Sequence, residues 1–171
     1  MAKYLRLLLF EDCERNCAGC CNKQFDLAAL PLCTDYKPYS LIMLTGGEPM
    51  LKPDVVWDAI AAVRKTSNAK IVLYTAKTDD RKALSWILDA VDGLTVTLHE
   101  QVDAKPLYEF TEYYWHTRHT FTRNKSLRLN VFSEVEHVPS LYGRWSIKSN
   151  LQWIDPCPLP EGEVFMRYPN D

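Results

Sequence analysis

The sequence lacks an excess of positive charge. Its 20 lysines and arginines are balanced by 22 aspartates and glutamates, which gives a formal net charge of −2 at neutral pH. A nucleic-acid-binding domain is recognised by a basic patch, and electrostatic attachment to a membrane surface needs a polybasic strip. We therefore expect no nucleic-acid partner and no membrane partner.

The sequence also lacks a long hydrophobic run. The apolar start, MAKYLRLLLF, is interrupted by Arg6 and is followed at once by Glu11 and Asp12. A secretory signal needs a longer apolar region with a small-residue cleavage site, and a membrane-spanning helix needs roughly 20 apolar residues. We expect a cytoplasmic protein, in a compartment where thiols stay reduced and clustered cysteines more often bind metal than form disulfides.

Internal repeats and low-complexity segments are absent from the sequence. With 47% hydrophobic and 25% charged residues, the composition is that of an ordinary globular protein, and the length suits one domain. Hydrophobic patterns predict strands at 4–10, 40–47, 70–76, 93–100 and 126–132, a possible sixth at 150–154, and helices at 53–67, 79–91 and 103–121. Residues 22–32 are expected to form a short helix or an irregular loop.

This alternation of strands and helices predicts an α/β fold with a parallel sheet and right-handed crossovers. We expect a partial (β/α) barrel of about five to six parallel strands, truncated at the C-terminal end. It would form one domain over 1–171, with a core at about 4–132 and an atypical tail at about 133–171. Because ligands bind at the C-terminal ends of parallel strands, one rim should carry the loop after the first strand, Gly46, Gly47, Glu48, Thr75, His99 and Asn130.

That loop holds four of the six cysteines, within EDCERNCAGCCN at residues 11–22, here called the cysteine loop. Cys13, Cys17 and Cys20 have the spacing C-x3-C-x2-C. Three thiolates on a short loop can each bind a different iron of an iron–sulfur cluster, and they leave one iron open to an outside ligand. A zinc site is an alternative, although it closes with four ligands, commonly from C-x2-C pairs, and no second pair exists. Inert buried thiols are a third interpretation.

The other three cysteines are predicted to play no part in such a site. Adjacent Cys20 and Cys21 fit poorly with a disulfide framework, and neighbouring side chains on a tight loop generally cannot reach the same face of a cluster. We therefore interpret Cys21 as a small packing residue. Cys33 and Cys157 are expected to be structural, with a redox thiol at the rim as the alternative for Cys157.

A second motif, TGGEP at 45–49, ends the predicted strand that follows the cysteine loop. Two glycines after a strand allow a ligand to approach the backbone closely, and Glu48 offers a carboxylate to an amine. Taken alone, the motif is more typical of a plain turn with an exposed acid.

Together, the C-x3-C-x2-C and Gly-Gly-Glu motifs, each after a strand, resemble the radical S-adenosylmethionine (SAM) superfamily over residues 4–132. The resemblance implies that Cys13, Cys17 and Cys20 bind a [4Fe-4S] cluster whose open iron takes the amine and carboxylate of SAM. It implies that Gly46, Gly47 and Glu48 hold the amine, with no catalytic residue beyond the cofactor ligands. Thr75, His99 and Asn130 are further candidates for SAM contacts, although a lone histidine such as His99 is more often structural.

The segments NCAGCCNK and IVLYTA, with the short barrel, resemble the small activating enzymes of anaerobic ribonucleotide reductase. This resemblance implies reductive cleavage of SAM to a 5'-deoxyadenosyl radical for hydrogen abstraction, a glycyl-radical enzyme as partner, and flavodoxin or ferredoxin as reductant. The aromatic tail at 108–168 departs from those activases. The alternatives are a radical SAM enzyme for a small molecule, such as a nucleotide or deazapurine precursor, and a non-enzymatic iron–sulfur or zinc module.

Overall fold

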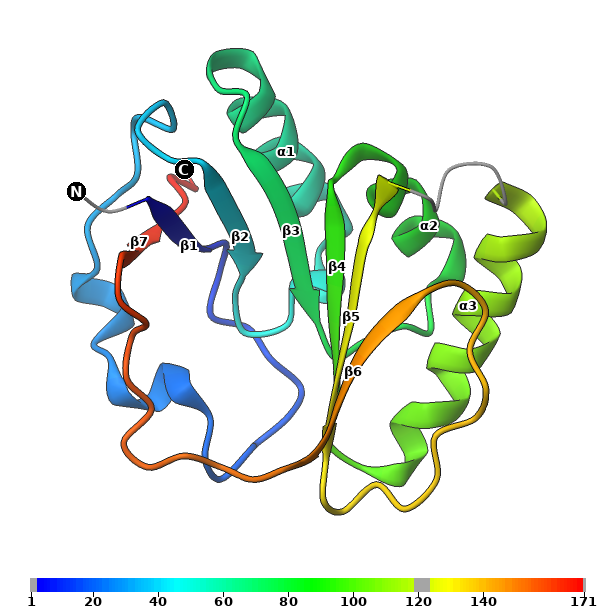
Figure 1. Ribbon diagram of the computed structural model, residues 1–171. Coiled ribbons are helices and arrows are strands. Elements are labelled where there is room, and N and C mark those ends of the chain that lie inside the picture. Colours follow the sequence, from blue (N-terminus) through cyan, green and yellow to red (C-terminus); the bar gives the residue numbers. More distant parts are fainter. Residues whose placement is uncertain (1–2, 119–123, 171) are drawn as a thin grey trace. The chain divides into compact units, whose positions relative to one another are not determined.

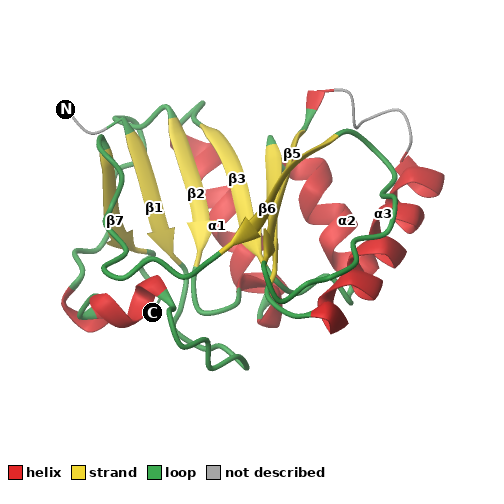
Figure 2. Cartoon of the chain, turned by 60° about the horizontal axis from the view of Figure 1, so that its bottom comes forward, coloured by secondary structure: helices red, strands yellow, loops and turns green. Residues whose placement is uncertain are grey.

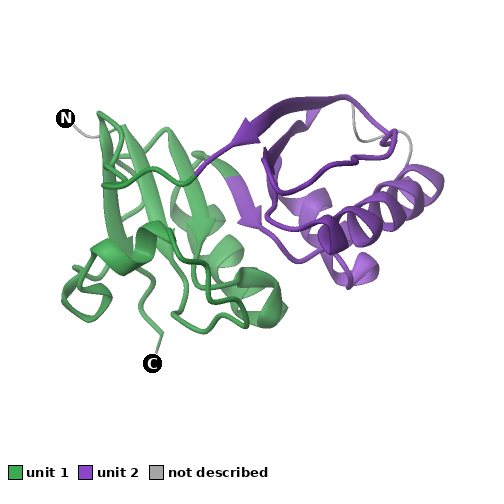
Figure 3. Cartoon of the chain, turned by 90° about the horizontal axis from the view of Figure 1, so that it is seen from below, with its two compact units in different colours: residues 1–71, 153–171 green, residues 72–152 purple. Residues whose placement is uncertain are grey.

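The computed structural model describes residues 3–118 and 124–170 (Figure 1). The chain divides into two compact units (Figure 3). The first unit contains residues 1–71 and 153–171, and the second contains residues 72–152. The boundary falls within strand β3 (Lys70–Thr75).

The described residues form seven strands and three α-helices. The strands are β1 (Tyr4–Leu8), β2 (Leu41–Thr45), β3 (Lys70–Thr75), β4 (Gly93–Leu98), β5 (Ser126–Phe132), β6 (Trp145–Leu151) and β7 (Glu163–Arg167). The helices are α1 (Pro53–Thr66), α2 (Arg81–Ala90) and α3 (Ala104–Arg118). The strands pair in parallel within both units, so the predicted α/β class is confirmed, whereas the partial barrel stays a prediction.

In the first unit, β1 lies between β2 and β7. Helix α1 begins with Pro53, whose fixed φ suits the first helical turn, and Val56, Ile60 and Val63 recur along one buried face. The inward-facing side chains of β1 and β2 are equally buried, including Leu5, Leu7, Ile42 and Leu44. Between the strands, the predicted region 22–32 forms only two short 3-10 turns, Cys21–Gln24 and Leu27–Ala29.

Strand β7 is the main feature of this unit that the sequence did not reveal. The C-terminal tail was expected to end a truncated barrel, but Glu163–Arg167 pairs in parallel with β1. Arg6 Nε lies 2.6 Å from Glu163 Oε1, and the guanidinium of Arg6 lies over the ring of Phe165. A five-residue segment with a glutamate at one end and an arginine at the other has too weak a hydrophobic pattern to identify a strand.

In the second unit, the strands follow the order β3–β4–β5–β6. Helices α2 and α3 lie on the same side of this sheet (Figure 2). Leu84, Leu88 and Phe110 of the helices are buried, as are the side chains of Leu73, Leu94 and Leu127 on the strands. The predicted helix at 103–121 is confirmed as far as Arg118, and its last three positions lie outside the described residues.

The sixth strand begins five residues earlier and ends three residues earlier than predicted. We expected it at 150–154, but β6 spans Trp145–Leu151. Its sequence, WSIKSNL, alternates weakly, and five consecutive residues from Ser146 to Asn150 are exposed. The strand is therefore defined by its backbone pairing with β5 rather than by burial of an apolar face.

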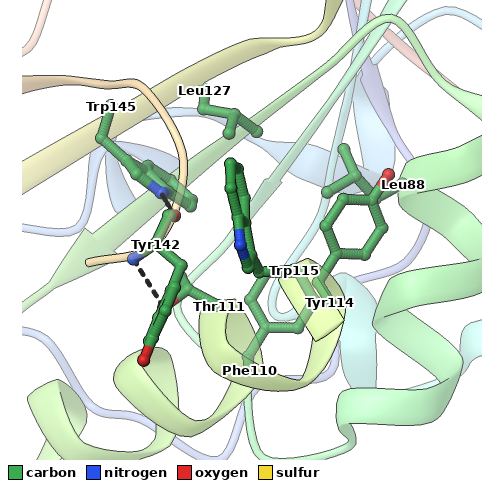
Figure 4. A pocket seen from close by; sticks show the side chains of 8 residues that line it. All are labelled: Leu88, Phe110, Thr111, Tyr114, Trp115, Leu127, Tyr142 and Trp145. Atoms are coloured by element: carbon green, nitrogen blue, oxygen red, sulfur yellow. Dashed lines mark hydrogen bonds between the residues drawn. The ribbon is translucent and has the colours of Figure 1, made fainter. Parts of the chain in front are cut away.

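The aromatic residues of α3 pack beneath the connection between β5 and β6, as Figure 4 shows. Phe110 and Tyr114 are buried, so these two rings belong to the core of this unit. Tyr142 N–H donates to Thr111 Oγ1 at 3.4 Å, and Trp145 Nε1 donates to Tyr142 O at 2.9 Å (Figure 4). Two leucines, five aromatic residues and one threonine line an apolar pocket here: Leu88, Phe110, Thr111, Tyr114, Trp115, Leu127, Tyr142 and Trp145.

Among the described residues, no helix combines the length and the apolar character that crossing a membrane requires.

Candidate functional site

The two motifs of the first unit are joined by backbone hydrogen bonds. The cysteine loop begins just after β1, and the turn formed by Gly46, Gly47 and Glu48, here called the GGE turn, follows β2. Gly47 N–H donates to Phe10 O at 2.8 Å, and Glu48 N–H donates to Asp12 O at 2.8 Å. Neighbouring parallel strands end side by side, and these two bonds extend their pairing into the loops.

The glycines of the GGE turn allow this close approach. A Cβ atom at Gly47 would collide with the carbonyl oxygens of Glu11 and Asp12, and one at Gly46 would lie 3.0 Å from Phe10 O. Glycine is therefore required because the entry to the cysteine loop passes directly against the turn. The sequence predicted that the glycines would leave space for a ligand. At Gly47, the backbone of the cysteine loop occupies the position of the missing side chain.

Two side chains strengthen the connection between the motifs. Asn22, at the end of the cysteine loop, donates from Nδ2 to Gly46 O at 2.9 Å. Lys52 forms an ion pair with Asp12, and its ammonium group lies 4.9 Å from the centre of the Phe10 ring. Asn22 lies in the NCAGCCNK segment and Lys52 lies outside both motifs; neither contact was predicted, because both side chains act across the strand pair.

Glu48 is buried, with only 3% of its surface exposed. Its Oε1 accepts a hydrogen bond of 3.0 Å from Met50 N–H and so caps the short 3-10 helix Pro49–Leu51. The acid of TGGEP is therefore buried, whereas the plain-turn interpretation expected it to be exposed. A buried carboxylate needs a donor or a cation beside it, and the backbone N–H of Met50 is one such donor.

Cys13, Cys17 and Cys20 carry unpaired thiols; Cys13 is exposed and the other two are half-buried. Burial raises the pKa of the Cys17 thiol, and the neighbouring charges of Cys20 and Cys13 raise this pKa further, against the lowering effect of Arg15 and Lys23. The three thiols are thus close enough for their charges to interact. Among the described residues, no group of three metal-binding side chains gathers around a single ion position.

This donor set fits the cluster that the sequence predicted. Three accessible thiols on one loop can reach different irons, whereas a zinc ion needs four ligands about 2.0–2.3 Å from one point. Arg15 and Lys23 place two positive charges near the sulfur of Cys17, where they offset the negative charge of a thiolate ligand. We therefore retain Cys13, Cys17 and Cys20 as the candidate ligands.

Cys21 forms a disulfide with Cys157, which contradicts the prediction that Cys21 is a packing residue and the alternative of a redox thiol at Cys157. Cys21 is not a packing residue, and Cys157 is not a lone thiol; their Cα atoms lie 5.5 Å apart and 136 residues separate them in the sequence. No local pattern reveals a pairing over that distance. One indirect signal was present in the sequence. Three of the six cysteines were assigned to a cluster, and the other three had no assigned partner.

The disulfide holds a C-terminal segment, residues 153–157, against the cysteine loop. Cys157 N–H donates to Gln24 Oε1 at 2.8 Å. Trp153 lies against Gly19, where an added Cβ would be 2.5 Å from the tryptophan side chain. Gly19 is thus explained by a contact rather than by a turn, and the tail belongs to the environment of the candidate site.

Cys33 is buried at 1% exposure, and its Sγ lies 3.6 Å from Asp35 O. Burial raises the pKa of this thiol, as expected for a structural rather than a reactive cysteine.

The remaining candidates belong to the second unit. Thr75 is buried, and its hydroxyl donates to Lys77 O and accepts from Lys77 N–H. His99 stacks on Phe132 with ring centres 5.1 Å apart. Asn130 pairs in register with Thr97 and Lys148. Their contacts with SAM, and the rim that would join them to the cysteine loop, stay predictions.

Comparison with known proteins finds no match: no family model, no curated protein and no solved structure matches the chain.

Proposed function

We propose that this chain is a radical SAM enzyme, in which Cys13, Cys17 and Cys20 hold a [4Fe-4S] cluster. The enzyme would reductively cleave S-adenosylmethionine to a 5'-deoxyadenosyl radical, which abstracts a hydrogen atom from a substrate. One observation carries the proposal: the backbone bonds from Gly47 to Phe10 and from Glu48 to Asp12 hold the two motifs of that chemistry side by side.

The chemistry of the site agrees with this function. When bound, such a cluster supplies the single electron that breaks a carbon–sulfur bond of the SAM sulfonium. The chain's own residues would position the reactants: three thiols would hold the cluster, and Arg15 and Lys23 near Cys17 would offset its charge. The GGE turn is hydrogen-bonded to Asp12, the residue that precedes Cys13. Backbone carbonyls of that turn and the buried Glu48 carboxylate are suitable partners for the ammonium group of SAM.

We further propose that the substrate is a glycyl-radical enzyme, with flavodoxin or ferredoxin as the cytoplasmic electron donor. Two apolar side chains favour a protein partner: Trp153 is 38% exposed and Ile154 is 65% exposed. Both lie in or beside the segment that the disulfide holds against the cysteine loop. Exposed aromatic and aliphatic residues next to a reactive site are typical of a docking surface.

The alternative is a small-molecule substrate, such as a nucleotide or a deazapurine precursor. The polar sheet face described in the next subsection favours this candidate. Electron paramagnetic resonance separates the two, because the reduced enzyme with SAM should produce a protein-based radical in an added anaerobic ribonucleotide reductase only if the first candidate is correct.

The proposed function predicts that cluster assembly and SAM cleavage both depend on Cys17. Protein reconstituted anaerobically with iron and sulfide, then given dithionite and SAM, should release 5'-deoxyadenosine. A Cys17→Ala variant should lose at least 100-fold of this activity and the iron absorption near 400 nm, because only two ligands remain. The measurement is chromatographic quantification of 5'-deoxyadenosine.

Cys33→Ala is the matched control, since it removes a cysteine outside the cysteine loop. This variant should bind iron and cleave SAM like the unaltered protein. Undiminished 5'-deoxyadenosine from Cys17→Ala, with circular dichroism showing both variants folded, contradicts the assignment of the cluster ligands.

A further inference from the structure

The sheet of the second unit has two chemically different faces. Side chains alternate between faces along a strand, and residues paired in register on parallel strands share a face. One face carries the leucines that pack beneath α2 and α3, whereas the other carries mainly polar side chains. We call the second the polar face and define it by Tyr74, Thr95, Thr97, Arg128, Asn130 and Lys148.

This polarity needs an explanation, because parallel sheets usually bury apolar side chains on both faces. The register places the residues in two adjacent rows. In the first, Tyr74 pairs with Thr95 and Thr95 pairs with Arg128. In the second, Thr97 pairs with Asn130, which pairs with Lys148.

Two positive charges stand close together on this face. Arg128 and Lys148 lie on neighbouring strands, offset by two residues along the strand direction, so their Cα atoms are about 8 Å apart. Both side chains are exposed, and neither pairs with an acid in the described part of the chain. Neither row contains an aspartate or a glutamate. Long side chains at this spacing can meet on one ligand.

Thr95 supplies an independent indication of a ligand. Its residue exposure is 3%, and its hydroxyl oxygen has no hydrogen-bond partner among the described residues. A buried hydroxyl without a partner costs roughly 1–3 kcal/mol, and it normally finds one in the folded protein or in what the protein binds. Thr95 lies beside Arg128 in the same row, so one bound group can satisfy the hydroxyl and the guanidinium together.

We propose that the polar face binds the phosphate group of a small molecule. A phosphomonoester carries a charge of about −1.5 to −2 at neutral pH and has three strong acceptor oxygens. It therefore matches two unpaired cations and an unpaired hydroxyl better than a carboxylate with a single charge. Arg128 is the main ligand, because its planar guanidinium can donate two parallel hydrogen bonds to phosphate oxygens. The identification of this molecule with the substrate rests on the proposed function, whereas the phosphate site itself does not.

The test is a titration of the isotopically labelled full-length protein with inorganic phosphate at constant ionic strength, followed by backbone amide NMR. No iron or SAM is added, so the result is independent of the proposed function. Phosphate should shift the amide signals of β4, β5 and β6. Arg128→Gln should weaken its binding at least 10-fold and Lys148→Gln about 5-fold. Lys105→Gln, which removes a cation from the exposed surface of α3 in the same unit, should leave binding unchanged.

Thr95→Val separates a ligand contact from a structural role. If Thr95 binds phosphate, the variant should bind about 3-fold more weakly while its melting temperature stays the same or rises, because an unsatisfied hydroxyl has been replaced by a methyl group of similar size. Unchanged phosphate binding in this variant, or in Arg128→Gln, overturns the proposal. Methionine serves as the carboxylate probe, and amide shifts on the polar face with methionine but not with phosphate would assign the site to a carboxylate instead.

Discussion

The two units of this chain hold their candidate functional groups by different physical means. In the first unit, the chemistry lies on irregular backbone: the cysteine loop is positioned by hydrogen bonds to the GGE turn, by glycine contacts and by a disulfide. In the second unit, the chemistry lies on regular strands, and the polar face is positioned by sheet register and by the packing of α2 and α3. Substitutions in the first unit should therefore have local and severe effects on stability and cofactor binding. Substitutions in the second unit should have graded effects on ligand binding.

The disulfide offers the largest test of this difference. Reduction by dithiothreitol, or the Cys157→Ser variant, should lower the free energy of unfolding of the first unit by about 4 kcal/mol, because the bond closes a loop of 136 residues. Hydrogen exchange measured by mass spectrometry should accelerate in residues 11–24 and 153–157, while the amides of β4 and β5 keep their protection.

Cys13→Ser is the control for this experiment, since it removes a thiol from the same loop and leaves the disulfide intact. Its exchange pattern should match that of the unaltered protein. The disulfide itself is tested by alkylation without reductant: labelling of Cys21 and Cys157 in the native protein would show that the bond does not form.

The GGE turn gives the second test. Gly47→Ala forces a Cβ atom against the backbone of Glu11 and Asp12, and the loop must move to admit it. We expect a loss of about 2–3 kcal/mol in the free energy of unfolding, together with loss of cluster binding, because the motif pair separates. Urea denaturation and iron content measure the two effects.

Gly46→Ala is the graded comparison. Its Cβ would lie 3.0 Å from Phe10 O, a contact that a small shift can relieve. The expected loss is about 1 kcal/mol. If Gly46→Ala and Gly47→Ala lower the free energy of unfolding equally, the backbone conformation of the turn determines the requirement for glycine. The contact with the cysteine loop would then not determine it.

The same difference between the units explains how much of the structure the sequence could predict. Helices and strands with strong hydrophobic periodicity, such as α1 with Val56, Ile60 and Val63, were predicted close to their observed bounds. The pairing of Cys21 with Cys157 was missed because it joins positions 136 residues apart, and β7 was missed because it is short and flanked by charged residues.

The candidate site was only partly predictable for the same reason. C-x3-C-x2-C and Gly-Gly-Glu are local patterns, so the sequence identified both and predicted that they adjoin. The contacts that join them are not local: Asn22 reaches Gly46, and Lys52 reaches Asp12. The role of Gly47 likewise depends on a neighbouring loop that no pattern around residue 47 specifies.

The smallest expected effect concerns one buried tyrosine in each unit and the response to alkaline pH. Burial raises the pKa of Tyr36 in the first unit to about 12, and the nearby charges of Cys33 and Tyr168 contribute. Burial also raises the pKa of Tyr114 in the second unit, where the phenol donates to Asp89 at 3.0 Å. Because each folded-state pKa lies above the unfolded value near 10, this contribution to stability is fully present below pH 10 and is lost as the pH rises through the folded-state pKa.

The two tyrosines should differ when each is replaced by phenylalanine. Tyr36→Phe removes an ionisable group, so above pH 10 the variant should lose about 1 kcal/mol less stability than the unaltered protein and should differ little from it at pH 8. Tyr114→Phe also removes the hydrogen bond to Asp89, so it should already cost about 1 kcal/mol at pH 8. Urea denaturation at pH 8, 10 and 11 measures both effects. If the free energies of unfolding of Tyr36→Phe and the unaltered protein differ by the same amount at all three pH values, Tyr36 does not ionise on unfolding. That result would contradict a folded-state pKa raised by burial.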